Sequence, residues 1–515
     1  MTPPLSRRDF LASTPAGALA LPWLVRRHDQ GLERDNPITA ENRRAGDAAW
    51  QVVNLARRHE IEGYASATSV RPGEPLFLHV RSETPVYTIH VFRLGWYAGL
   101  GGRLVAGPIV RRDGARHPVP AADRTGFLTC NWPVSQVLDI PADWPGGVYF
   151  AKLTNALGVE SGILFVVRRP QAAALLCQIP VTTYQAYNNW GGKSLYDFQS
   201  PGGRAFHVSF DRPYSADALV GDRGFFYCDF QLVRWLESQG YDVGYCTNID
   251  IHREPDLAAS HPVYLSCGHD EYWSVEMMDH VERARQAGSH LLFLSADTCH
   301  WVIRMSQDAR SAACYKHADL DPAAPVTVRF RDPQIGRPEV ALMGVQNELH
   351  CITPTSLGYG KSGAPARYRV QAPDHPLLRH TGLTTDDGFE AIVGFEWDAV
   401  YPGGPEVAVL LQCDDLQATC KYEDALDVTL PAQAVAFEQS LTDGRRSKTF
   451  SSGTIRWSWG LDAWQFDGDD RRSRVRPQLR QMTANILAWM GVLPASPDGD
   501  LVVDPTLRNG STRPV

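Results

Sequence analysis

Ten cysteines are scattered through the 515 residues, and no two of them form a C-x-x-C pair. The absence of that spacing argues against a zinc ribbon or an iron–sulfur site. Cys177 and Cys267 stand in apolar, strand-like runs, and we expect them to be buried free thiols. Cys413 and Cys420 are close enough in sequence to be bridged, which the sequence neither requires nor excludes.

Long apolar runs and basic stripes are also missing. Beyond the N-terminus no segment has 18 consecutive apolar residues, so we expect no membrane-spanning helix there. The net charge of −8 is mild and no stripe is rich in Lys or Arg, which makes nucleic acid an unlikely partner class. The charged fraction of 21% and the hydrophobic fraction of 43% are typical of a soluble globular protein. A chain of this length is expected to form two or three domains.

The first 30 residues resemble an export signal. In Ser6-Arg7-Arg8-Asp9-Phe10-Leu11 a paired arginine precedes two apolar residues, and the weakly hydrophobic segment 11–25 follows. This layout is typical of a twin-arginine signal, which predicts recognition of residues 1–30 by the twin-arginine export machinery and a periplasmic or extracellular bacterial location. The alternative, an N-terminal helix of the mature domain, is disfavoured by Pro15 and Pro22. Retention as an uncleaved anchor stays open.

Residues 31–170 predict a β-sandwich domain. Short alternating runs such as 76–80 and 87–93 have the period of two that strands with one buried face require. Gly and Pro clusters, for example Pro72-Gly73, separate the runs. The pattern favours an immunoglobulin-like or jelly-roll module without its disulfide.

Residues 171–495 change to alternating strands and helices, which predicts a mostly parallel α/β domain. The overall fold class is therefore a multidomain α/β plus β protein. The segment of about 320–455 again has a strand-like, turn-rich sequence and is interpreted as a β-rich insertion or a third subdomain. Residues 496–515 are expected to form a tail.

Polar residues follow three of the predicted strands of this domain. The segments are 182–192, with two tyrosines and two asparagines, Gly268-His269-Asp270-Glu271, and Ala296-Asp297-Thr298-Cys299-His300. The carboxyl ends of parallel strands share one edge of a sheet, where α/β proteins bind ligands. We therefore expect the three segments to converge on one crevice. The alternative is that each segment only caps the helix that follows it.

Four strings within these regions carry a family resemblance: YQAYNNWGGKSLY, RWLESQGYDVGY, SCGHDEYW and GTIRWSWGL. They resemble the large (β) subunit of N,N-dimethylformamidase and its relatives over roughly 178–490. The resemblance implies hydrolysis of the C–N bond of a small amide. It also implies an α/β core like that of class I glutamine amidotransferases without the cysteine nucleophile, and a mononuclear iron held by two tyrosines and one glutamate.

Carried over residue by residue, the resemblance makes Glu271 the glutamate ligand and His269 the active-site histidine beside the metal. One tyrosine ligand falls in the YQAYNN string, where Tyr187 is preferred over Tyr184. Tyr227, just before the RWLE string, is the candidate for the second.

The chemistry of these residues is coherent. Free tyrosine has a pKa of about 10, so a Lewis-acidic cation is needed to hold it as a phenolate. Two phenolates and a carboxylate suit a hard trivalent ion such as ferric iron better than zinc. His269 or Asp270 would carry the proton to the departing amine. Asp297 stands where the family is expected to have an asparagine, and it adds a negative charge near the site.

Other interpretations remain open. Trp190, Trp273 and Trp301 flank the three segments and would wall a small apolar pocket, or simply pack in the core. A cysteine-dependent amidotransferase-like enzyme would use Cys267 or Cys299, although neither lies in a G-x-C-x-G elbow. An exported non-catalytic binding protein is the third class. The sequence also leaves open whether the chain forms a homo-oligomer. The resemblance implies a small accessory subunit, and the sequence leaves open whether this chain needs one.

Overall fold

The computed structural model describes residues 35–216, 224–351, 366–418, 420–421, 429–465 and 474–509. The export signal predicted over residues 1–30 therefore lies outside the described residues. The unit Asp35–Val515 is a mixed α/β fold with several sheets and few helices, in agreement with the predicted class at that level. In the part of the chain that is described, none of the helices combines the length and the apolar character needed to cross a membrane.

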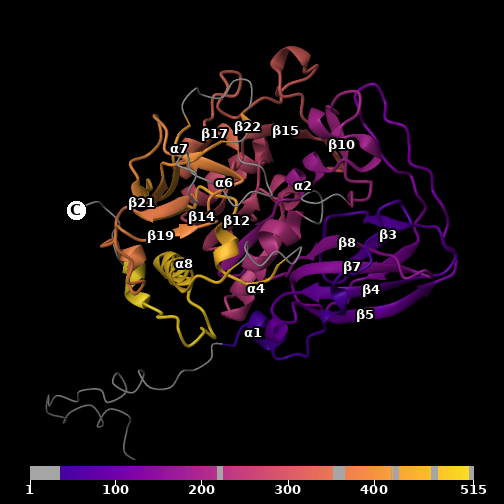
Figure 1. Cartoon of the computed structure of the whole chain (residues 1–515), viewed down its shortest axis with the longest axis horizontal. Coiled ribbons are helices and arrows are strands. Elements are labelled where there is room, and N and C mark those ends of the chain that lie inside the picture. The colour runs from indigo at the N-terminus through magenta and orange to yellow at the C-terminus, as the bar shows by residue number, and fades with distance from the viewer. Residues whose placement is uncertain are drawn as a thin grey trace, which may run out of the picture. The chain divides into compact units, whose positions relative to one another are not determined.

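The N-terminal strands form two sheets around a shared hydrophobic core (Figure 1). The core forms because buried and exposed side chains alternate along the strands. In one strand Leu76, Leu78 and Val80 are buried, whereas Phe77 is 37% exposed. The larger sheet contains, in spatial order, β2 (Ser69–Val70), β8 (Glu160–Val167), β7 (Gly147–Asn155), β4 (Tyr87–Leu94) and β5 (Gly102–Arg111). The smaller sheet contains β1 (Ile61–Ala65), β3 (Pro75–Ser82) and β6 (Gln136–Asp139).

The largest sheet has nine strands, all of which come from the part of the chain between Leu175 and Ser451. In spatial order they are β11 (Val243–Thr247), β9 (Leu175–Ile179), β12 (Val263–His269), β14 (His290–Ala296), β24 (Arg446–Ser451), β23 (Ala432–Ser440), β21 (Ala408–Cys413), β18 (Arg367–Val370) and β19 (Gly388–Glu390). Neighbours are parallel from β11 to β24 and antiparallel from β24 to β19. The segment predicted as an insertion thus supplies strands that extend this sheet.

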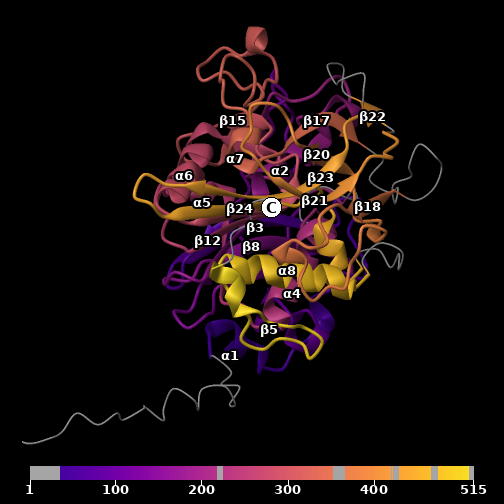
Figure 2. The same cartoon turned by 90° about the vertical axis from the view of Figure 1, so that its left-hand side faces the viewer.

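Two small sheets and the helices complete the described fold. One sheet contains β10 (His207–Ser209), β16 (Ser311–Ala313), β15 (Trp301–Met305) and β13 (Tyr272–Ser274), and the other β20 (Glu396–Ala399), β17 (Gln346–Cys351) and β22 (Cys420–Lys421). The helices are α1 (Pro37–Asn42), α2 (Val181–Tyr187), α4 (Phe230–Ser238), α5 (Asn248–Arg253), α6 (Val275–Gln286), α7 (Val340–Met343) and α8 (Pro477–Trp489). α5 and α6 pack against each other (Figure 2).

Local sequence explains where these elements begin and end. Ser274 caps α6, because its hydroxyl accepts a hydrogen bond from the Met277 backbone N–H. The chain from 496 to 509, predicted as a tail, packs against α8 through the short helix Pro505–Asn509, where Leu507 is buried. Cys413 is a free buried thiol, so the bridge to Cys420 that the sequence left open is not formed.

A buried ion pair joins the N-terminal sheets to α4. Arg93 on β4 donates from Nη2 to Glu237 Oε1 at 2.7 Å and from Nη1 to Oε2 at 2.9 Å, and both side chains are fully buried. Arg93 Nη1 also donates to the Tyr97 hydroxyl at 3.0 Å, and the Tyr245 hydroxyl donates to Glu237 Oε1 at 3.1 Å. Charges removed from water are stable only when their partners are in place.

Arg93→Met should therefore lower the free energy of unfolding by about 3–5 kcal/mol, because it leaves the Glu237 carboxylate buried without its cation. The double substitution Arg93→Met with Glu237→Met should recover much of that loss. Urea unfolding of both variants measures the effect. Arg445→Met, which removes a largely exposed pair with Asp443, is the control and should cost less than about 1 kcal/mol.

Candidate functional site

The ends of three neighbouring parallel strands build the site. β9, β12 and β14 lie side by side, and in the β12–β14 register His269 lies opposite Ala296. His269 is the last residue of β12, Glu271 follows two residues later, and Asp297 comes directly after β14. β9 continues into α2, which ends at Tyr187. The three polar segments of the sequence therefore converge at one edge of the sheet.

The backbone at these strand ends adopts uncommon conformations. Gly268 has φ +62, and a Cβ at this position would clash with the Asp229 carboxylate, so only glycine fits. Asp297 and Cys299 have φ +52 and +48, in a region that costs a non-glycine residue about 1–3 kcal/mol. The Cys299 N–H donates to the Asp270 carbonyl at 2.9 Å, which ties this turn to the end of β12.

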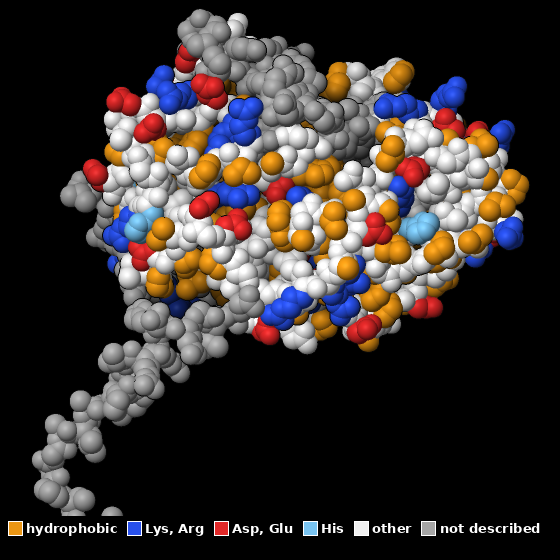
Figure 3. Space-filling view, turned by 60° about the horizontal axis from the view of Figure 1, so that its bottom comes forward, with side chains coloured by type: hydrophobic (Ala, Val, Ile, Leu, Met, Phe, Trp, Pro, Cys, Tyr) orange, Lys and Arg blue, Asp and Glu red, His pale blue; other side chains and the backbone are white. Residues whose placement is uncertain are grey.

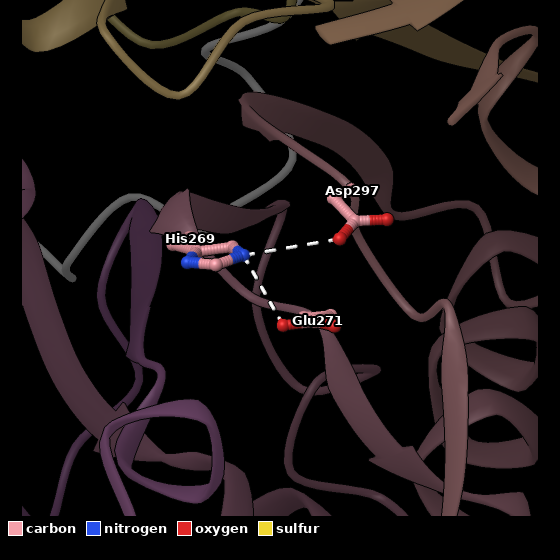
Figure 4. A group of neighbouring side chains, drawn as sticks. All are labelled: His269, Glu271 and Asp297. Carbon is pink, nitrogen blue, oxygen red and sulfur yellow. Dashed lines mark ion pairs between the residues drawn. The ribbon is translucent and has the colours of Figure 1, made fainter. Parts of the chain in front are cut away.

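Three carboxylates surround the imidazole of His269, and Figure 4 shows two of them, those of Glu271 and Asp297. His269 Nε2 lies 2.8 Å from Glu396 Oε2, 3.3 Å from Glu271 Oε2 and 3.9 Å from Asp297 Oδ2, and all four side chains are buried. We call these four residues the His269 cluster. None of the close approaches is aligned as a hydrogen bond, so Nε2 and one oxygen of each carboxylate have no hydrogen-bond partner among the described residues. Such atoms are rare in protein interiors.

Burial and charge set the protonation of this cluster. Burial opposes the charge on His269, but Glu396, Asp297 and Glu271 outweigh it and hold the pKa of His269 well above its usual value. Burial, followed by the charges of Glu396 and Glu271, raises the pKa of Asp297 well above its usual value. Burial would also raise the pKa of Glu271, but the contact with His269 holds it below its usual value. The carboxylates therefore favour the cationic imidazole and the imidazolium favours the ionised Glu271, whereas burial and like charge favour the neutral form of Asp297.

Tyrosine hydroxyls approach the cluster from the segment after β9. The Tyr196 hydroxyl donates to Glu271 Oε1 at 2.6 Å and forms a hydrogen bond of 2.7 Å with the Tyr187 hydroxyl, and the two tyrosine rings stack with their centroids 4.3 Å apart. Tyr227 lies with Tyr187 and His269 on the wall of a cavity of about 20 Å³. Tyr184 instead donates to Asp229.

Two residues of the site, Tyr196 and Glu396, were not predicted from the sequence. Tyr196 is the last letter of the string YQAYNNWGGKSLY, so position in that string was the available signal. Glu396 stands at the start of β20 in a turn-rich part of the sequence, with Asp398 two residues further on, and no recognisable motif marks it as a site residue.

The structure does not bring Asp270 into the cluster. Its buried carboxylate accepts hydrogen bonds from Gln178 Nε2 at 2.6 Å, Ser266 Oγ at 2.8 Å and Asn248 Nδ2 at 2.8 Å. These donors come from β9, β12 and α5, so the carboxylate links the elements beneath the site. The catalytic role expected for Asp270 stays a prediction, and its contacts are those of a structural residue.

The three tryptophans do not wall one pocket, as the sequence had suggested. Trp273 is fully buried, whereas Trp190 and Trp301 line two different cavities. The alternative of ordinary core packing holds for Trp273.

Asp270→Ala should lower the free energy of unfolding by about 3 kcal/mol or more, because it leaves three buried donors without an acceptor. Glu271→Gln should lower it by less, by about 1 kcal/mol, because it keeps the shape and an acceptor for Tyr196 and loses only the attraction to the His269 imidazolium. Urea unfolding of the metal-free variants measures both. An equal loss in the two variants would contradict this division of roles.

Comparisons with known proteins agree with the quoted strings. A search of curated proteins found no match to this chain. The family model described as N,N-dimethylformamidase beta subunit-like, C-terminal, matches residues 88–471. The match begins in β4 and includes every residue of the His269 cluster. With most of its length covered, the chain belongs to the N,N-dimethylformamidase beta subunit-like family.

Proposed function

We propose that this protein is a metal-dependent hydrolase that cleaves the C–N bond of a small amide, with iron as the metal and a core arranged like that of glutamine amidotransferases. The observation that carries the proposal is the His269 cluster, in which buried acids crowd one imidazole at the end of parallel strands. Perturbed acids at such an edge are typical of active sites. The family points to the same reaction class.

The described residues fit a hard cation. Buried oxygens of Glu271, Asp297 and Glu396 have no hydrogen-bond partner among the described residues, and a cation satisfies such atoms. The neighbouring cavity of about 20 Å³ has the size of one ion or water molecule. Glu271, Tyr187 and Tyr227 would hold the metal. Their oxygen donors match the preference of ferric iron.

When bound, the metal would polarise the amide carbonyl and lower the pKa of a bound water. His269 is placed to carry a proton between the carboxylates and the departing amine. The rings of Phe395 and His269 pack edge to face with their centroids 5.3 Å apart, so Phe395 covers the imidazole on that side. Asp297, whose Oδ2 lies 3.9 Å from the same imidazole nitrogen, would contact the substrate in the same site.

The cysteine-dependent alternative is disfavoured by the surroundings of both thiols. Cys267 and Cys299 are buried, and their pKa values are raised well above the usual range: by the neighbouring Cys177 thiol and burial for Cys267, and by burial for Cys299. A nucleophilic thiol needs the opposite shift and an accessible position.

Export by the twin-arginine route stays a prediction, as does assembly with a small accessory subunit or with further copies of the chain. The proposed export route would suit a metalloenzyme, because it carries folded proteins with their metal loaded.

The purified protein should contain about one iron per chain and show a visible absorption band from phenolate-to-iron charge transfer. Glu271→Ala should lower the iron content at least about tenfold, because it removes an anionic ligand. Elemental analysis and a visible spectrum provide the test. Glu438→Gln, an acid on β23 outside the site, is the matched control and should keep the iron.

The same visible absorption band tests each proposed tyrosine ligand individually. Tyr187→Phe and Tyr227→Phe should each weaken the band, whereas Tyr264→Phe, a fully buried tyrosine control, should keep it. If Tyr196→Phe abolishes the band and Tyr227→Phe leaves it intact, the second ligand is Tyr196.

Release of amine from small formamides and acetamides should depend on both the metal and Glu271. Glu271→Ala should lower kcat/KM about a hundredfold or more, since the site loses its metal. Removal of iron by a chelator should have the same effect, reversed by added iron. A metal-free chain that stays active and is stopped by a thiol alkylator would refute the proposal.

A further inference from the structure

A second, much larger cavity lies on the other side of Tyr196. The Tyr196 hydroxyl donates to Glu271, while the same side chain lines a cavity of about 1380 Å³. This volume exceeds what a formamide fills and suits a substrate of the size of a drug molecule or larger. The cavity therefore lies one tyrosine side chain away from Glu271 of the His269 cluster.

The wall of this cavity carries an excess of positive charge. Arg124, Lys193, Arg204 and Lys316 line it, and none of them forms an ion pair with a carboxylate in the described part of the chain. Lys193 Nζ donates only to carbonyl oxygens, at 2.6 Å and 2.9 Å, and Arg204 donates to the Tyr315 carbonyl at 2.8 Å. Positive charge that lacks a carboxylate partner in a concave surface attracts anions.

The acids of the same wall are already engaged. Asp332 accepts a hydrogen bond from Arg329 Nε at 3.0 Å, and Asp123 accepts three from the turn that follows it. Asp197 accepts a backbone N–H at 2.8 Å. On the face shown in Figure 3, by comparison, acidic and basic side chains are interspersed, and the whole chain has a net charge of −8. The cationic cavity is a local departure from that balance.

Among the cations of the cavity wall, Lys316 packs on Tyr196, whose hydroxyl contacts Glu271. Its Nζ lies 3.6 Å from the centroid of the Tyr196 ring, 4.9 Å from that of Trp301 and 5.4 Å from that of Tyr272. The three aromatic rings hold a half-buried ammonium group one tyrosine ring away from Glu271. The backbone at Lys316 has φ +62, an uncommon conformation for a residue with a side chain.

Apolar side chains line the cavity beside these cations. Phe198 is 76% exposed and Leu320 is 53% exposed, although both are large hydrophobic residues. The Phe198 ring lies 5.3 Å from that of Tyr196. A ligand with an anionic group and an apolar body would cover both kinds of surface at once.

We infer that this cavity is a substrate subsite that binds the carboxylate of an N-acylated amino acid with a large apolar side chain, with Lys316 facing the carboxylate and Phe198 and Leu320 covering the side chain. The assignment of a substrate rests on the proposed function, because the acyl C–N bond would be the bond hydrolysed at the His269 cluster. Water supplies the hydroxyl to the acyl carbon and the proton to the nitrogen, so N-formylphenylalanine would give formate and phenylalanine.

The test compares N-formylphenylalanine with its neutral methyl ester, with formate release as the readout. Wild type should have a kcat/KM at least about tenfold higher for the acid, the size of effect expected of a charge-assisted hydrogen bond. Lys316→Met keeps the apolar stem and removes the charge, and it should abolish this preference. Arg112→Met removes an exposed cation outside the cavity and should leave the ratio of the two substrates unchanged.

Equilibrium binding separates the subsite from the reaction. By calorimetry, 3-phenylpropionate should bind wild type at least about tenfold more tightly than 3-phenylpropanol does, and Lys316→Met should remove the difference. Binding of this kind without hydrolysis of any amide would support the subsite and refute the proposed function. Hydrolysis of acid and ester with equal kcat/KM, together with equal binding of the two phenyl ligands, would refute the subsite and leave the proposed function standing.

Discussion

The crowding of three buried carboxylates around one imidazole nitrogen is the constraint on which the site depends. Glu271, Asp297 and Glu396 all lie within 3.9 Å of His269 Nε2, where water is excluded. A single imidazolium neutralises only one of these charges, so burial together with the charges of Glu396 and Glu271 raises the pKa of Asp297. Such a group is stable only if the scaffold forces it together or a further cation joins it. The scaffold contributes through the uncommon backbone of Gly268 and Asp297.

The buried Arg93–Glu237 pair acts at a distance from the site but on the same elements. Glu237 belongs to α4, and α4 continues directly from the π-helical turn Phe225–Asp229 that contains Tyr227. The pair therefore fixes α4 against the N-terminal sheets, and with it the segment that delivers a proposed ligand. This arrangement gives the N-terminal sheets a function in the site although none of their residues enters the His269 cluster.

The sequence predicted the framework of the site because that framework is local. Strand runs, the cap at Ser274 and the polar residues after three strands are readable from nearest neighbours, and parallel strand ends meet at one edge by geometry. Glu396 could not be found in this way, since its approach to His269 depends on where the strand β20 is placed by long-range packing. Asp270 shows the opposite case, in which a neighbour in sequence is not a neighbour in the site. It is adjacent to Glu271 in the sequence, but its carboxylate accepts hydrogen bonds from Gln178, Asn248 and Ser266.

Tyr196 connects the two spaces around the proposed metal site and therefore links reaction to specificity. Its hydroxyl contacts Glu271 and Tyr187, and Tyr187 lines the 20 Å³ cavity, whereas the Tyr196 ring lines the 1380 Å³ cavity and packs against the Lys316 ammonium. Residues that hold the reacting bond and residues that select the substrate are thus separated by one side chain. The strand ends can remain unchanged while cations and apolar residues of the larger cavity vary. Family membership therefore constrains the reaction class more tightly than it constrains the substrate.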